Sequence, residues 1–215
     1  KTNNELYTCI SFDFKRKKII NTNIPSQDIK IGDILHIKKN QRAPADLLIL
    51  QSAKDNDDNY QKYHQDTMYI RTDQLDGETD WKIRKPPALT YKMNVRQLFV
   101  NNIMIEYDPP SKQIYEFKGV ISLYNKKKDD VQSEAINLEN TMWGNTVLAS
   151  EDVYGVVIYT GRDTRSKMNA SKAKNKVGQL DNEINYLNKV LFVIMVILSF
   201  VVVLFKECGI NFRII

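Results

Sequence analysis

The chain contains 215 residues, and its 31 Lys and Arg residues exceed its 26 Asp and Glu residues, which gives a formal net charge of +5 at pH 7. A hydrophobic content of 42% and a charged content of 27% exclude a disordered tail, a collagen-like fibre and a disulfide-rich scaffold. The length suits one or two domains with a hydrophobic core. The mean hydropathy of −0.43 describes a mildly polar chain, but this average hides a strongly apolar segment near the C-terminus.

Short strands are expected along the first 160 residues, because runs of β-branched and aromatic residues alternate with turn sequences. The residues 54–66 and 125–135 are polar or charged and are expected to form loops, whereas 95–107 fits either a strand or a short helix. The expected strands, in chain order, are 6–12, 17–22, 33–39, 46–52, 67–72, 79–85, 112–124, 141–149 and 152–161.

From about Ser171 the apolar residues recur at alternating steps of four and three, which predicts a stalk helix over 171–189. The next segment, 190–205, contains sixteen residues of which only Ser199 is polar. With its flanks it reaches about twenty residues, enough to cross a hydrocarbon core of ~30 Å. We therefore expect a transmembrane helix at 190–206 and the start of a lumenal or exoplasmic loop at 207–215. A buried core helix is the alternative, but this segment lacks the polar stripe of such helices. The apolar series before the span consists of Ala173, Val177, Leu180, Ile184, Leu187 and Leu191.

Basic residues lie mainly on the N-terminal side of the apolar segment, and only Lys206 and Arg213 follow it. The positive-inside rule then places residues 1–189 in the cytosol, next to an anionic membrane surface. No basic stripe with interleaved aromatic residues is present, so no nucleic-acid partner is expected. The basic residues that precede the segment are Arg162, Arg165, Lys167, Lys172, Lys174, Lys176 and Lys189.

Common catalytic and metal-binding motifs are absent from the sequence. Cys9 and Cys208 would lie on opposite sides of the membrane boundary, so neither a disulfide nor a zinc site is expected. His36 and His64 have no evident partner and are expected at the surface. No metal site is predicted.

An acidic cluster stands out in residues 72–84, TDQLDGETDWKIR. Its spacing is not that of a calcium-binding loop, which needs ligands at alternate positions before its glycine. By local rules alone, Asp76 and Gly77 form a hairpin turn and Glu78 is a solvated side chain.

Three blocks of the chain, in the same order, resemble the actuator domain of P-type ATPases, and more closely that of the type IV group, the phospholipid flippases. The first block, 29–50, contains Gly32-Asp33 and Pro44-Ala45-Asp46. The second block is the Asp-Gly-Glu-Thr loop at 76–79. The third block, 145–171, resembles the segment that leads to the third membrane helix of the family. The resemblance implies a mainly β fold: a distorted jelly-roll actuator domain at 1–170, followed by a stalk helix that continues into a transmembrane helix.

The departures from the commoner flippase pattern also carry information. Cation pumps have Thr where this chain has Asp76, so the loop is similar to that of flippases. Most flippases have Asn-Leu-Lys where this chain has Asp80-Trp81-Lys82. They also have Lys-Arg-Ser where this chain has Lys-Val-Gly-Gln, beginning at Lys176. Both resemble the flippase subclass of endosomal and Golgi membranes that works without an accessory subunit.

The resemblance implies a role for each residue of the loop. Glu78 orients the water that hydrolyses an aspartyl-phosphate and can accept its proton. Gly77 permits a positive φ and a close approach of the backbone to the phosphoaspartate. Asp76 and Thr79 fix the loop geometry through bonds between side chain and backbone. Asp46 is expected to secure the strand pair of the first block.

The 215 residues include neither the phosphorylated aspartate nor a nucleotide pocket, so the resemblance implies a fragment of an ATP-driven phospholipid pump. ATP and Mg²⁺ would serve the full-length protein, with none bound by this fragment. The implied partners are a phospholipid substrate, the membrane and the phosphorylation domain of the same polypeptide. The implied membrane is that of the endosome, the Golgi or another endomembrane. Two alternatives stay open: the actuator domain of a cation-transporting P-type ATPase, and a non-enzymatic, tail-anchored β-domain that binds lipid or a partner protein.

Overall fold

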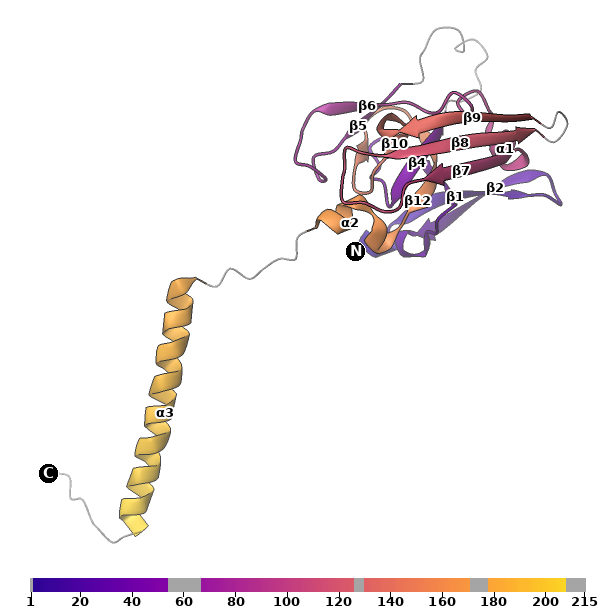
Figure 1. Cartoon of the computed structure of the whole chain (residues 1–215). Coiled ribbons are helices and arrows are strands. Elements are labelled where there is room, and N and C mark those ends of the chain that lie inside the picture. Colours follow the sequence, from indigo (N-terminus) through magenta and orange to yellow (C-terminus); the bar gives the residue numbers. More distant parts are fainter. Residues whose placement is uncertain (1, 54–66, 126–129, 171–177, 208–215) are drawn as a thin grey trace. The chain divides into compact units, whose positions relative to one another are not determined.

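A computed structural model describes residues 2–53, 67–125, 130–170 and 178–207 of the chain (Figure 1). The chain divides into two units, Lys1–Ala170 and Ser171–Ile215. The first unit is built mainly of strands, and the described part of the second is a single long helix. The expectation of a mainly β fold followed by a helix is confirmed.

A six-stranded antiparallel sheet forms the centre of the first unit, in the order β10-β4-β12-β3-β1-β2. Strand β4 buries six of its seven residues, and the apolar run 47–50 at its centre fits burial on both faces of the sheet. The strands of this sheet are β1 (Leu6–Asp13), β2 (Lys18–Pro25), β3 (Ile34–Ile37), β4 (Asp46–Ser52), β10 (Thr141–Met142) and β12 (Val153–Tyr159).

Two three-stranded antiparallel sheets complete the unit. One has the order β11-β5-β6 and consists of β5 (Met68–Arg71), β6 (Trp81–Arg84) and β11 (Val147–Leu148). The other has the order β7-β8-β9 and consists of β7 (Asn102–Tyr107), β8 (Lys118–Asn125) and β9 (Asp130–Asn137).

The core has two parts, one on each face of the central sheet, because successive residues of β4 point to opposite faces. Leu47 and Ile49 share a buried cluster with Met68 and Ile70 of β5. Leu48 and Leu50 share the other cluster with Ile121 of β8 and Ile136 of β9, together with Trp143 and Phe117. The central sheet is therefore the middle of three layers.

Short helices connect the strands. The ambiguous segment 95–107 contains both candidate structures, because α1 (Val95–Val100) is followed directly by β7. Asn94 and Gln97 cap α1 through a reciprocal capping box. The remaining short helices are α2 (Arg165–Asn169) and the 3₁₀ helices η1 (Thr2–Asn4), η2 (Ser26–Asp28), η3 (Leu138–Asn140) and η4 (Gly161–Asp163).

The expectation of a loop over 125–135 is wrong for its second half. Residues from Asp130 onward form β9, which pairs with β8 from Lys118↔Asn137 to Asn125↔Asp130. The strand is polar because it is the edge of its sheet, and Ile136 is its single buried residue among those whose side chains are described. Residues 126–129 and the expected loop at 54–66 lie outside the described residues.

Two expected strands are shorter than predicted. Within 112–124 only the part from Lys118 is a strand, and 112–117 is an irregular connection. The segment 141–149 is two short strands, β10 and β11, which belong to different sheets. Between them the chain turns at Gly144 and Asn145, where Asn145 adopts a φ of +75°.

The second unit contains α3 (Gln179–Glu207), whose apolar side chains are exposed. The span Gln179–Lys206 is long and apolar enough to cross a membrane, and none of it is buried. The stalk helix was expected from residue 171, but the described helix begins only at Gln179, directly after Gly178. A glycine lowers helix stability, so a start after Gly178 is physically reasonable. Residues 171–177 and 208–215 lie outside the described residues.

Candidate functional site

The acidic loop connects β5 to β6 and covers residues 72–80. The two strands pair from Met68↔Arg84 to Arg71↔Trp81, so the loop contains nine residues and not the two of a tight Asp-Gly hairpin. Its base is fixed on both sides. Strand β5 pairs with β11, and the buried Arg84 Nε donates to the Thr141 carbonyl of the central sheet at 2.8 Å.

Asp76 is the internal anchor of this loop, with a side chain that is only 4% exposed. Its Oδ2 accepts the Thr72 hydroxyl at 3.0 Å and the Lys82 ammonium at 2.6 Å. Its Oδ1 accepts the backbone N–H of Glu78 at 3.0 Å. The side chain of Asp76 is therefore hydrogen-bonded to the backbone and to two side chains of its own hairpin.

The charges of Asp76 and Lys82 stabilise each other. Burial acts to raise the pKa of Asp76, but the hydrogen bonds from Lys82, from the Glu78 backbone and from Thr72 outweigh it, so the pKa lies below its ordinary value. Burial likewise acts to lower the pKa of Lys82, and the contacts with Asp76 and Glu78 raise it above its ordinary value. Both groups are therefore charged at neutral pH.

Gly77 follows Asp76 with a φ of +79°, a conformation that other residues rarely adopt. A Cβ atom at this position would meet no atom within 4 Å. The glycine is thus required by the path of the backbone, which turns outward and leaves open space beside it.

Glu78 is the exposed member of the loop, with 51% of its side chain accessible. Its Oε2 lies 2.8 Å from the Lys82 ammonium, and its Oε1 accepts the Tyr115 hydroxyl at 3.2 Å. The carboxylate is therefore held by two partners while part of it faces solvent. Thr79 is also exposed, and within the described ranges its hydroxyl makes no hydrogen bond, so the predicted side-chain anchor is found at Asp76 and not at Thr79.

Two members of the site were missed by the sequence reasoning. Lys82 appeared only as part of a family comparison, although its spacing of four residues from Glu78 allows an ion pair. Tyr115 lies 37 residues from Glu78 along the chain, and no local signal points to it. Its ring also lies against the Lys82 ammonium, with 5.1 Å between the nitrogen and the ring centroid.

Asp46 is fully buried and does not touch this loop. Its Oδ1 accepts the Gly144 N–H at 2.7 Å, and its Oδ2 accepts the Arg165 N–H at 2.9 Å and lies 3.6 Å from the Arg165 guanidinium. Strand β12 separates β3 from β4, so Asp46 cannot tie those two strands together as expected. It connects β4 to the turn after β10 and to the start of α2.

His36 also differs from expectation, because it has a partner. Its Nε2 lies 3.1 Å from Asp152 Oδ2, and its ring packs against Tyr154 at a centroid distance of 4.9 Å. The pairing of β3 with β12 brings the two rings together, because His36 lies opposite Tyr154. His64 and Cys208 lie outside the described residues.

The described residues do not form a metal site. Among the described residues, no group of three or more His, Cys, Asp and Glu side chains could hold a metal ion. The carboxylates of Asp76 and Glu78 do not fit a divalent cation either, because the Lys82 ammonium lies 2.6 Å from one and 2.8 Å from the other. A metal there would meet a fixed positive charge.

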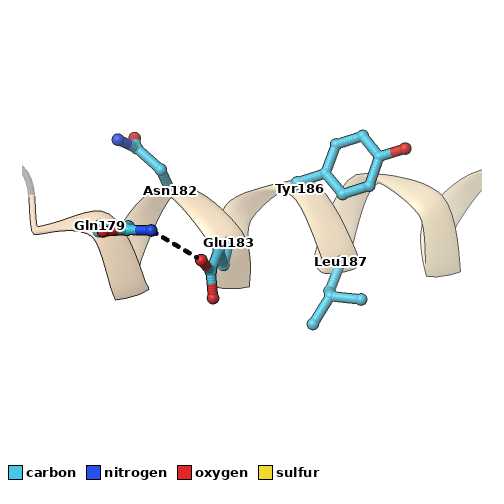
Figure 2. Close-up of a pocket in the computed structure, with 5 residues that line it drawn as sticks. All are labelled: Gln179, Asn182, Glu183, Tyr186 and Leu187. Atoms are coloured by element: carbon cyan, nitrogen blue, oxygen red, sulfur yellow. Dashed lines mark hydrogen bonds between the residues drawn. The ribbon is translucent and has the colours of Figure 1, made fainter.

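A shallow hollow lies on one side of α3 (Figure 2). Its five residues come from one helix, and the Gln179 amide donates to Glu183 at 3.4 Å across it. A single helix cannot enclose a ligand, so the loop 72–80 remains the candidate site. The residues around the hollow are Gln179, Asn182, Glu183, Tyr186 and Leu187.

The substitution Asp76→Asn is expected to lower the free energy of unfolding by about 2 kcal/mol at pH 7, because it weakens hydrogen bonds to a charged group. The pKa of Asp76 is lower in the folded chain than in the unfolded chain. Its contribution to the free energy of unfolding is therefore complete above the ordinary pKa of 3.8 and is lost as the pH falls through the pKa of the folded state. The raised pKa of Lys82 preserves the pair up to its ordinary pKa of 10.5.

Urea unfolding of the chain in detergent at pH 3 to 9 measures this effect. The difference between the unmodified chain and Asp76→Asn should be constant from pH 5 to 9 and shrink below pH 4. Asp80→Asn, in the same loop but exposed, is the control and should change stability little. A difference that grows on acidification would contradict the prediction.

No protein-family profile matches the chain, but individual relatives do. The phospholipid-transporting ATPase neo1 of Schizosaccharomyces pombe is 40% identical over 197 residues, which cover 92% of this chain. In Caenorhabditis elegans, the probable phospholipid-transporting ATPase tat-5 is 38% identical over 95% of the chain, and the phospholipid-transporting ATPase tat-1 is 32% identical over 81%. The chain spans 16% of the length of neo1, 18% of tat-5 and 14% of tat-1.

Proposed function

By this homology the chain belongs to the type IV, phospholipid-transporting ATPase family, and we propose that it forms the actuator domain of such an enzyme with its stalk and one transmembrane helix. The domain would remove the phosphoryl group from an aspartyl-phosphate in the phosphorylation domain of the same polypeptide. The observation that carries this proposal is the half-exposed carboxylate of Glu78, held in place from two sides.

The proposed step is an attack of water on phosphorus, in which the new O–P bond forms as the bond between phosphorus and the aspartyl oxygen breaks, so that inorganic phosphate and the free aspartate carboxylate are released. A carboxylate can accept about four hydrogen bonds, and Lys82 and Tyr115 occupy two of those positions on Glu78. The remaining positions can accept both hydrogens of one water, which aligns its oxygen for in-line attack. Glu78 then takes the proton that the water releases.

The other loop residues would support this step. Asp76 and Gly77 hold the loop in its outward path, with Asp76 neutralised by Lys82. The exposed Thr79 hydroxyl is available to the phosphoryl group. Hydrolysis would be coupled to movement of the membrane helices through the stalk, which continues along α3.

The remaining partners follow from the family. In the full-length protein, ATP and Mg²⁺ would be bound outside this chain, and a phospholipid would be the transported substrate. The resemblance of Asp80-Trp81-Lys82 to one flippase subclass supports an endosomal or Golgi location and no accessory subunit for the full-length protein. Residues 1–189 would be cytosolic and 190–206 would cross the membrane.

The direct test is the lifetime of the phosphorylated intermediate in the full-length protein, which should depend on the carboxylate of Glu78. A lipid-dependent rate of ATP hydrolysis separates a flippase from a cation pump. An ATPase rate that responds to a cation and not to phospholipid would refute the assignment of substrate.

The isolated 215-residue chain is expected to have no ATPase activity, because it contains none of the groups that would bind ATP or accept its phosphate. Release of inorganic phosphate, measured with purified chain in detergent and compared with the full-length protein, tests this. Turnover that copurifies with the chain would overturn its assignment as a fragment of the enzyme.

A further inference from the structure

Tyr115 contacts three charged side chains of the candidate site: Asp76 and Glu78 of the loop, and Lys82 of β6. Its hydroxyl donates to Glu78 Oε1 at 3.2 Å and lies 3.5 Å from Asp76 Oδ2, and its ring lies against Lys82. The ring is 55% exposed, so packing alone does not fix it. Desolvation, followed by the hydrogen bond to Glu78, raises the pKa of Tyr115, so the hydroxyl keeps its proton and remains a donor.

The backbone around Tyr115 is held instead. Side chains from three other positions donate to four carbonyls within residues 112–116, although this segment belongs to no strand or helix. The segment is therefore anchored on both sides of Tyr115. The contacts are Asn169 to Lys112 at 2.7 Å, Arg165 to Gln113 at 3.0 Å and to Glu116 at 3.2 Å, and Trp143 to Ile114 at 2.9 Å.

Arg165 is the centre of this support. It is 1% exposed, its guanidinium lies 3.7 Å from the centroid of a Trp143 ring, and its charge is balanced by Asp46. Arg165 donates from Nε and Nη2 to two carbonyls of the 112–116 segment, while its Nη1 lies 3.6 Å from Asp46 Oδ2 and has no hydrogen-bond partner among the described residues. The position of the 112–116 segment is thus set by the central sheet and α2.

We propose that Tyr115 is a positioning residue for Glu78: its hydroxyl, held by the Arg165-supported segment, fixes the orientation of the Glu78 carboxylate toward the attacking water. This inference rests on the proposed function of Glu78. A misplaced catalytic group costs rate even when it is chemically intact, because in-line attack requires close alignment.

The experiment uses the full-length protein in phospholipid vesicles and follows the formation and decay of the phosphorylated intermediate. Tyr115→Phe keeps the ring and its contact with Lys82 but removes the hydroxyl. Tyr69→Phe is the control, because Tyr69 of β5 is also an exposed tyrosine and its hydroxyl makes no hydrogen bond within the described residues. Glu78→Gln and the double variant complete a cycle.

We expect Tyr115→Phe to slow decay about fivefold to tenfold while phosphorylation and the KM for ATP stay unchanged. Tyr69→Phe should decay at the unmodified rate. In the Glu78→Gln background the loss of the hydroxyl should slow decay less than about twofold, because the group it positions has already lost its function. Normal phosphorylation shows that each variant is folded.

Two results would overturn the inference while leaving the proposed function intact: an unmodified decay rate in Tyr115→Phe, or effects of the two substitutions that multiply in the double variant. If Glu78→Gln itself decays at the unmodified rate, the proposed function fails and the inference fails with it. The cycle therefore distinguishes the two failures.

Discussion

Replacement of Glu78 by glutamine is expected to slow decay of the phosphorylated intermediate in the full-length protein by about 10²–10⁴-fold, the usual contribution of a general base. Glutamine has the same shape and can still accept the Tyr115 hydroxyl, but it cannot accept a proton from water or balance the charge of Lys82. Formation of the intermediate should be unchanged, because Glu78 has no part in phosphorylation. Phosphoenzyme should therefore accumulate, which a chase with unlabelled ATP measures.

Glu106→Gln is the matched control for this prediction. Glu106 is an exposed glutamate in β7, in the same unit but in a different sheet. The same change of charge there should leave decay unaffected. If both variants decay alike, the slow step does not depend on the carboxylate of Glu78, and the proposed mechanism is wrong.

The substitution Asp46→Asn is expected to cost about 3 kcal/mol of unfolding free energy, within the range for breaking a buried ion pair. The amide removes the negative charge beside the buried Arg165 guanidinium and places a donor where one of the two Asp46 oxygens accepted an N–H group. For a chain of this size the melting temperature should fall by roughly 6–12 °C. Thermal unfolding of the chain in detergent measures the change.

Asp13→Asn is the matched control, because Asp13 makes the same kinds of contact at the surface. Its Oδ1 accepts the N–H groups of Lys15 and Arg16, and its Oδ2 lies 3.8 Å from the Arg16 guanidinium, which is 82% exposed. Exposed pairs of this kind contribute about 0–1 kcal/mol. Equal destabilisation by both substitutions would show that burial is not the cause of the Asp46 effect.

The local sequence pattern predicts an element correctly where the composition of that segment is enough to determine its structure. Strands β1, β4 and β12 follow from runs of apolar and β-branched residues, and the Asp76–Thr79 loop lies within one hairpin. Strand β9 was missed because an edge strand has little reason to be apolar. Its pairing with β8, and not its own composition, makes it a strand.

The partners of the site could not be predicted from the sequence for a different reason. Tyr115 is 37 residues from Glu78, and Arg165 is 119 residues from Asp46. Such contacts depend on how the sheets are layered, which is a property of the whole unit. A buried arginine would indicate a buried carboxylate partner, but the sequence alone does not show which of its arginines is buried.

The position of β12 has a consequence for synthesis of the protein. This last strand lies between β3 and β4 in the middle of the central sheet, although more than 100 residues separate it from both. Until residues 153–159 leave the ribosome, the apolar strand β4 has no neighbour along one edge and must avoid pairing with other chains. The long apolar helix α3 follows soon afterwards, so the sheet is completed only shortly before α3 is synthesised. The central sheet can therefore be completed only late in translation, and a chain that stops before Val153 would retain an open, aggregation-prone sheet.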